Sequence, residues 1–107
     1  MHVVRKMTHG FVYILRCSDG RYYYGSTNNL IHRLAEHEKG RVQSTKWRLP
    51  VEIVYFQEFQ TLNQARQMER SLKNGRTRRK VIERMIASFS PDRLVPFAVA
   101  ARQGFTG

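Results

Sequence analysis

The amino-acid sequence predicts an α+β fold in which helices flank a small three-stranded sheet that is at least partly antiparallel. Two short runs rich in tyrosine and β-branched residues stand near the start of the chain, on either side of an Asp-Gly turn. A third apolar run follows, and three stretches carry apolar residues at helical spacing. The element order is therefore β-β-α-β-α-α, and a length of 107 residues with 41% hydrophobic residues is typical of one domain.

Two of the three expected strands form a hairpin near the start of the chain, and the third follows the first helix. The first covers about Gly10 to Arg16 and the second about Arg21 to Ser26, and both are rich in residues that favour strands. They are joined at Asp19-Gly20, which is a strong hairpin signal. The third strand covers Val51 to Phe59 after Pro50, and it is apolar enough to lie centrally in the sheet.

The hairpin loop decides which tyrosines share a face, because a shift of one residue turns every side chain over. A two-residue loop at Asp19-Gly20 would place Tyr13 and Tyr23 on opposite faces. A three-residue loop, Ser18 to Gly20, would pair Tyr13 with Gly25 and place the two tyrosines on one face. Glycine in the last loop position favours the longer loop, so we predict a shared face.

Three helices are expected from apolar spacing and end signals. The first runs from about Asn28 to Lys39, before a glycine. The second runs from Thr61 to about Asn74, and Gln64 completes a capping box at its start. The third runs from about Thr77 to the Ser-Pro pair at 90–91, since proline cannot continue a helix.

The chain divides into a basic leader expected to be flexible (1–9), one domain (10–88) and a C-terminal extension of unknown role (89–107), with a possible helical piece near 94–102. No apolar run approaches the roughly 18–20 residues of a membrane span. The single cysteine, Cys17, cannot form an intrachain disulfide, so a reducing compartment is the simplest expectation. We therefore expect a cytoplasmic protein without a membrane partner.

The net charge of +11, from 19 basic and 8 acidic side chains, predicts a polyanionic partner, with nucleic acid as the first candidate. Basic residues gather between positions 66 and 84, where only two glutamates oppose eight basic side chains. Such an unmixed surface favours phosphate contacts. The residues predicted to bind nucleic acid are Lys46, Arg48, Lys73, Arg76, Arg78, Arg79 and Lys80.

Glu69 lies at the edge of the apolar stripe of the second helix, seven residues after Leu62. A carboxylate in that place is costly unless it is paired or bound to a cation. One interpretation is a surface pair with Lys73, its i+4 neighbour, worth a few tenths of a kcal/mol. The other is an inward carboxylate that holds a divalent metal ion.

Arg33 and His37 are four residues apart and share one face of the first helix. They fit either a solvated helix face, or a phosphate clamp beside a group that titrates near neutral pH. The tyrosines of the hairpin likewise fit a packing surface, stacking on the bases of a single strand, or catalysis by a hydroxyl whose pKa a nearby cation lowers.

Together these positions resemble the GIY-YIG nuclease domain. Its two tyrosine-bearing strand motifs correspond to Phe11-Val12-Tyr13 and Tyr23-Tyr24-Gly25, followed by Arg33 in HRLAEH and Glu69 in ARQMERSLK. The resemblance covers residues 10–86. It is strongest to small, stand-alone, single-domain bacterial members, through the segments VYILRC, YYGST, RLAEH and PVEIVY.

This resemblance implies a three-stranded antiparallel sheet flanked by helices, and metal-dependent endonuclease hydrolysis of phosphodiesters, with DNA favoured over RNA. It implies that Tyr13 is the general base or orients the attacking water, and that Tyr23 orients water or phosphate. Arg33 would stabilise charge on the phosphoryl oxygens. His37 would assist proton movement or bind phosphate, and Glu69 would be the single protein ligand of one Mg²⁺ or Mn²⁺ ion.

The chain departs from the family pattern at three positions. Phe11 replaces the first glycine, Val81 stands where some members have asparagine, and Ser26 stands where repair nucleases have lysine. Two other functions therefore stay open: a non-catalytic nucleic-acid-binding module on the same fold, and a basic interaction protein whose tyrosines are core residues. A protein partner or a homodimer is also compatible with the sequence.

Overall fold

A computed structural model of the chain describes residues 9–96. One antiparallel sheet in the order β2-β1-β3 is built from β1 (Gly10–Arg16), β2 (Tyr22–Thr27) and β3 (Glu52–Phe59). The helices are α1 (Leu30–Glu38), α2 (Leu62–Lys73) and α3 (Arg79–Ala87), with short 3₁₀ turns η1 (Lys46–Arg48) and η2 (Pro91–Leu94). The predicted α+β fold and element order are confirmed.

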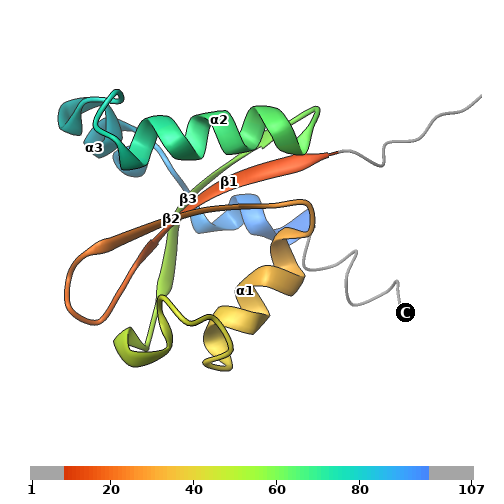
Figure 1. Cartoon of the computed structure of the whole chain (residues 1–107), viewed down its shortest axis with the longest axis vertical. Helices are drawn as coiled ribbons and strands as arrows, with labels where there is room; N and C mark the ends of the chain where they lie inside the picture. The colour runs from red at the N-terminus through yellow and green to blue at the C-terminus, as the bar shows by residue number, and fades with distance from the viewer. Residues whose placement is uncertain (1–8, 97–107) are drawn as a thin grey trace, which may run out of the picture.

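The helices cover the two faces of the sheet, α1 on one and α2 with α3 on the other (Figure 1). Between residues 9 and 96, no helix is long and apolar enough to cross a membrane. Most of the leader and most of the helical piece expected near 94–102 lie outside the described residues.

The hairpin of β1 and β2 has the predicted three-residue loop. The Cys17 N–H donates to the Arg21 carbonyl at 2.9 Å, which leaves Ser18 to Gly20 as the loop. Gly20 adopts a φ of 81°, in the left-handed region that favours glycine. In this register Tyr13 lies opposite Gly25. Tyr13 and Tyr23 therefore share a face, as predicted.

The central position predicted for β3 is wrong, because β1 is the central strand and β3 lies at an edge. β3 is apolar because layers cover both of its faces. Phe56 belongs to the core cluster on the α1 face of the sheet, whereas Val54 belongs to the cluster beneath α2 and α3. An apolar strand therefore indicates that both of its faces are covered, but it does not indicate how many neighbouring strands it has.

The core has two parts, separated by the sheet. On the α1 face, buried side chains of β1 and β3 pack with Leu30, and on the opposite face they pack with Leu72 and Ile82. The start of α2 approaches β1 very closely at Gly10. A Cβ atom there would lie 2.5 Å from the Leu62 Cα atom, so only glycine fits without displacing the backbone.

The helix starts are set by capping side chains. Asn29 caps α1 and accepts from the His32 N–H at 3.1 Å. Thr61 and Gln64 form the predicted capping box of α2, with hydrogen bonds of 3.1 and 3.2 Å. The third helix begins at Arg79, two residues after the predicted start at about Thr77, whose hydroxyl is bound to Ser71 at 2.6 Å.

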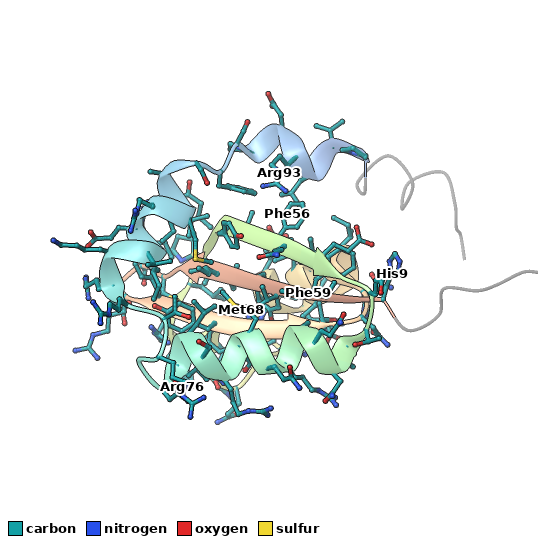
Figure 2. All side chains as sticks on the ribbon, turned by 90° about the horizontal axis from the view of Figure 1, so that it is seen from above. His9, Phe56, Phe59, Met68, Arg76 and Arg93 are labelled. Atoms are coloured by element: carbon teal, nitrogen blue, oxygen red, sulfur yellow. The ribbon has the colours of Figure 1, made fainter. Side chains whose placement is uncertain are left out.

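The segment after α3 folds back against the edge strand. The Phe89 and Phe56 rings meet edge to face, with their centroids 5.7 Å apart. The Arg93 guanidinium lies 5.4 Å from the Phe56 ring centroid, and Figure 2 shows these two side chains side by side. Such cation–π contacts contribute about 0.5–1 kcal/mol at exposed sites.

Candidate active site

Tyr13, His37 and Thr45 form a buried chain of hydrogen bonds. The Tyr13 hydroxyl lies 2.8 Å from His37 Nε2, and His37 Nδ1 lies 2.8 Å from Thr45 Oγ1. Tyr13 is 1% exposed, and the other two side chains are 0% exposed. Burial and the nearby charge of Arg33 lower the pKa of His37 to about 4. His37 is therefore neutral near pH 7, and the solvated helix face considered from the sequence is wrong for this residue.

Gly25 is the residue that leaves room for the Tyr13 hydroxyl. A Cβ atom at Gly25 would lie 2.4 Å from Tyr13 Oη and 2.5 Å from its Cζ. Tyr13 therefore lies across its partner on β2, with the phenol end directly over the Gly25 backbone. The Tyr23 ring stands beside it, with centroids 6.2 Å from Tyr13 and 5.1 Å from His37.

Arg33 lies one helical turn before His37 and belongs to the same group. Its guanidinium is close enough to the Tyr13 hydroxyl to affect the pKa of both groups, and it forms an ion pair of 3.3 Å with Glu36. Burial raises the pKa of Tyr13 well above its ordinary value, the neighbouring Tyr23 adds to this, and Arg33 only partly offsets it. The Tyr13 side chain is accordingly a neutral phenol near pH 7.

Glu69 approaches the same part of β2 from α2, on the other face of the sheet. Its Oε1 atom accepts from the Ser26 hydroxyl at 2.5 Å, and Lys73 Nζ lies 2.6 Å from Oε2. The side chain is 19% exposed. Glu69 is thus paired with Lys73, as in the first interpretation, and it is also mostly buried and hydrogen-bonded to the strand that carries Gly25; metal binding stays a prediction.

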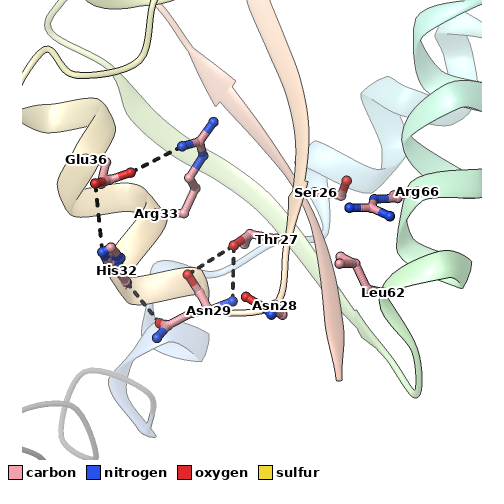
Figure 3. A pocket seen from close by; sticks show the side chains of 9 residues that line it. All are labelled: Ser26, Thr27, Asn28, Asn29, His32, Arg33, Glu36, Leu62 and Arg66. Carbon is pink, nitrogen blue, oxygen red and sulfur yellow. Dashed lines mark hydrogen bonds and ion pairs between the residues drawn. The ribbon is translucent and has the colours of Figure 1, made fainter. Parts of the chain in front are cut away.

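An open groove of about 390 Å³ adjoins these groups where β2 ends and α1 begins. Figure 3 shows that α1 contributes Arg33 on one side, while Ser26 and Arg66 lie together on the other. Arg33 lies near Tyr13 and Ser26 is hydrogen-bonded to Glu69, so the groove is the solvent-exposed space next to these residues. The lining residues are Ser26, Thr27, Asn28, Asn29, His32, Arg33, Glu36, Leu62 and Arg66.

The model of the family described as the GIY-YIG catalytic domain matches residues 9–81, which include all five residues predicted to be catalytic. The chain belongs to the GIY-YIG family. Individual proteins to which the chain is similar carry the name UPF0213.

A UPF0213 protein of Listeria monocytogenes serotype 4b is 42% identical over 69 residues, which are 64% of this chain and 78% of that protein. A UPF0213 protein of Natronomonas pharaonis is 37% identical over 78 residues, which are 72% of this chain and 89% of that protein. The solution NMR structure of a UPF0213 protein from Bacillus halodurans matches with a TM-score of 0.48 and 26% identity, over 90% of this chain and 99% of that one. These names state no activity or substrate.

The basic residues predicted to bind nucleic acid fall into two groups in this GIY-YIG domain. Lys46 and Arg48 lie on η1, on the α1 side of the sheet, whereas the others lie on α2, on α3 and between them (Figure 1). Some are already paired: Arg48 contacts Asp19 at 3.0 Å, and Arg79 contacts Glu83 at 3.3 Å. Their contact with nucleic acid stays a prediction.

Two polar residues of the site were not among the predicted ones. Thr45 orients His37 from the loop after α1, and no periodic pattern marks that loop. Ser26 was expected only as the end of the second strand and as the residue that stands where repair nucleases of the family carry lysine. In this structure it binds Glu69, and Lys73 brings an ammonium group to the same carboxylate from α2.

Proposed function

We propose that this GIY-YIG protein is a metal-dependent endonuclease that hydrolyses nucleic-acid phosphodiesters, with DNA favoured over RNA. The observation that carries the proposal is the buried chain from Tyr13 through His37 to Thr45, beside Arg33. A buried tyrosine needs some partner for its hydroxyl whatever its role, and a histidine held by Thr45 with Arg33 nearby adds a group that can accept a proton and a cation that can bind phosphate. The net charge of +11 supports a polyanionic substrate.

Tyr13 and His37 are suited to move a proton together. In the tautomer with the proton on Nδ1, His37 donates to Thr45 and accepts from the Tyr13 hydroxyl. Tyr13 then passes its proton to His37 as it takes one from the attacking water, and a free phenolate is never required. A phosphate at Arg33 offsets one of the two effects that lower the pKa of His37, so substrate binding favours this transfer.

Arg33 and Tyr23 are placed to hold the phosphate. Arg33 lies on the groove and presents a planar fork of donors that suits phosphate oxygens. Its charge is in place before the reaction, which is how fixed donors stabilise charge that develops in a transition state. Tyr23 is half-buried beside Tyr13, and we assign its hydroxyl the role of orienting water or phosphate.

The surroundings of Glu69 fit one magnesium or manganese ion. These ions prefer oxygen ligands, and Mg²⁺ usually keeps most of its waters. Residues 9–96 contain no group of three or more His, Cys, Asp or Glu side chains that could enclose a metal, so Glu69 would hold the ion as a single carboxylate, with Ser26 beside it. The ion would supply positive charge for the leaving oxygen. Lys73 must give up Oε2 for the ion to bind there.

The test is cleavage of duplex, flap, junction, single-stranded DNA and RNA substrates with Mg²⁺ or Mn²⁺. The matched variant is Glu69→Gln, which keeps an oxygen acceptor for Ser26 but removes the charge. We expect the wild-type protein to cut at least one substrate and the variant to lose that activity. Equal cutting by both proteins would overturn the assignment of Glu69.

A non-catalytic binding module is the second candidate, and one observation favours it. Ser26 and Lys73 each engage one oxygen of Glu69, so both oxygens have a partner without a metal. This module would bind the same substrates with equal affinity in the wild type and in Glu69→Gln, and neither protein would cut them.

A further inference from the structure

Trp47 is the only tryptophan of the chain, and 83% of it is exposed. Among the large apolar side chains of residues 9–96, none is more exposed. An indole ring is large and rigid, so it normally gains free energy from burial. A single exposed apolar residue needs no explanation in general. Trp47 differs from such a residue in two ways: its backbone is anchored on both sides, and a basic side chain lies over its ring.

The backbone on both sides of Trp47 is tied to the folded domain. Thr45 is buried and bound to His37 at 2.8 Å, two residues before the tryptophan. Arg48 follows it, contacts Asp19 at 3.0 Å, and accepts a hydrogen bond from the Ser18 N–H at 2.9 Å through its carbonyl. The turn η1 is thus anchored at both ends, and it presents the ring to solvent from a fixed position.

The charge around the ring suits a nucleotide. Lys46 Nζ lies over the indole, 5.1 Å from its centroid, so one face carries a cation and the other is free for a flat partner. Exposed Lys39 and Arg41 precede this turn in the chain. An aromatic face beside basic side chains is the combination by which proteins bind single-stranded nucleic acid, through stacking and phosphate contacts.

We propose that Trp47 stacks on an unpaired base of the nucleic acid, while Lys46 contacts a neighbouring phosphate. This inference rests on the proposed function and narrows its substrate to strands with unpaired bases near the cut, such as flaps or single strands. The turn that carries Trp47 is linked to the candidate active site by few contacts, because Thr45 is hydrogen-bonded to His37, and His37 is hydrogen-bonded to Tyr13. A base inside an intact duplex already stacks on its neighbours and offers Trp47 no free face.

Intrinsic fluorescence tests this directly, since Trp47 is the only tryptophan. The full-length protein is titrated, with EDTA present to prevent cleavage, with oligothymidine, with an abasic strand of equal length, and with a blunt duplex. Oligothymidine should quench the emission strongly, and the other two should quench it weakly. In a parallel anisotropy assay with a labelled strand, Trp47→Leu should bind oligothymidine roughly tenfold more weakly. Trp47→Phe, which keeps an aromatic face, should recover most of this loss.

Equal quenching by the abasic strand and oligothymidine would overturn the inference, and so would unchanged affinity in Trp47→Leu. Circular dichroism would confirm that the leucine variant is folded. The failure of the nuclease proposal looks different: quenching and affinity behave as expected, but no substrate is cut. If instead duplexes are cut and Trp47→Leu makes no difference to cutting or binding, the nuclease proposal stands and the stacking site does not.

Discussion

The Tyr13 hydroxyl lies 2.8 Å from His37 Nε2, where the two side chains are 1% and 0% exposed. A buried polar group costs free energy unless it is hydrogen-bonded, so each of these residues needs the other. Thr45 satisfies the second ring nitrogen of His37. The pair therefore couples the stability of the domain to the chemistry proposed for it, and substitutions at either residue should affect both.

Tyr13→Phe keeps the ring and removes the hydroxyl, which leaves His37 Nε2 buried without its partner. We expect a loss of about 1–3 kcal/mol in the free energy of unfolding, measured with urea. Cleavage should fall by about 100-fold or more, because a positioned proton-transfer group typically contributes that much. Tyr55→Phe is the matched control. It removes a hydroxyl that contacts Gln57 at 3.0 Å, and cleavage should stay unchanged. Wild-type cleavage by Tyr13→Phe would rule out the proton-transfer role.

Stability should depend on pH through His37. Burial lowers its pKa to about 4 in the folded protein, from 6.5 as the ordinary value, so the unfolded chain binds the proton more readily. The stabilisation is complete above about pH 6.5 and is lost as the pH falls from there towards 4, by roughly 2–3 kcal/mol. Urea unfolding at several pH values measures this. The dependence should flatten in His37→Gln and persist in a variant of exposed His32. A dependence that His37→Gln leaves intact would assign it to other groups.

The hairpin was predictable from the sequence, and the surroundings of His37 were not. The Ser18-Asp19-Gly20 loop determines the register, and the register alone places Tyr13 opposite Gly25. Helical spacing places Arg33 and His37 on one face, but it does not show that the tyrosines of the sheet cover His37. That depends on how α1 packs, which is a property of the tertiary structure.

The edge position of β3 and the contact of Thr45 with His37 were not predictable, for similar physical reasons. The apolar residues of β3 indicate that both faces of the strand are covered. The order of strands in the sheet depends instead on which backbones form hydrogen bonds with each other. The contact of Thr45 with His37 depends on the path of the loop between α1 and η1, which has no periodic pattern. In both cases local sequence patterns do not show the deciding interaction: β3 pairs with a strand distant from it in the chain, and Thr45 reaches His37, eight residues before it, through an irregular loop.

Gly25→Ala should disturb the site through Tyr13. The added Cβ atom would lie 2.4 Å from Oη and 2.5 Å from Cζ, so the buried phenol must move away from His37. We expect a loss of about 1–3 kcal/mol in unfolding free energy, as for other overpacked sites, and a large loss of cleavage.

Gly75→Ala is the matched control for the glycine substitution. Gly75 has a φ of 83°, and nothing lies within 4 Å of an added Cβ atom, so alanine there strains the backbone without touching the site. It should cost about 1–2 kcal/mol of stability and leave cleavage intact. If the two variants lose cleavage to the same extent, the loss reflects general destabilisation and the contact with Tyr13 is not its cause.

Lys73 should compete with a divalent metal ion for Glu69. Its ammonium group lies 2.6 Å from Oε2, and this hydrogen bond raises the pKa of Lys73, so the cation is held near neutral pH. Replacing it by methionine frees the oxygen and removes a nearby positive charge. Mn²⁺ binding to the protein without nucleic acid, measured from the electron paramagnetic resonance signal of free Mn²⁺, should tighten by roughly fivefold. Arg70→Met makes the same charge change on the exposed face of α2 and should have a smaller effect. Glu69→Gln should abolish the binding in each background, and equal tightening in Lys73→Met and Arg70→Met would show that only net charge matters.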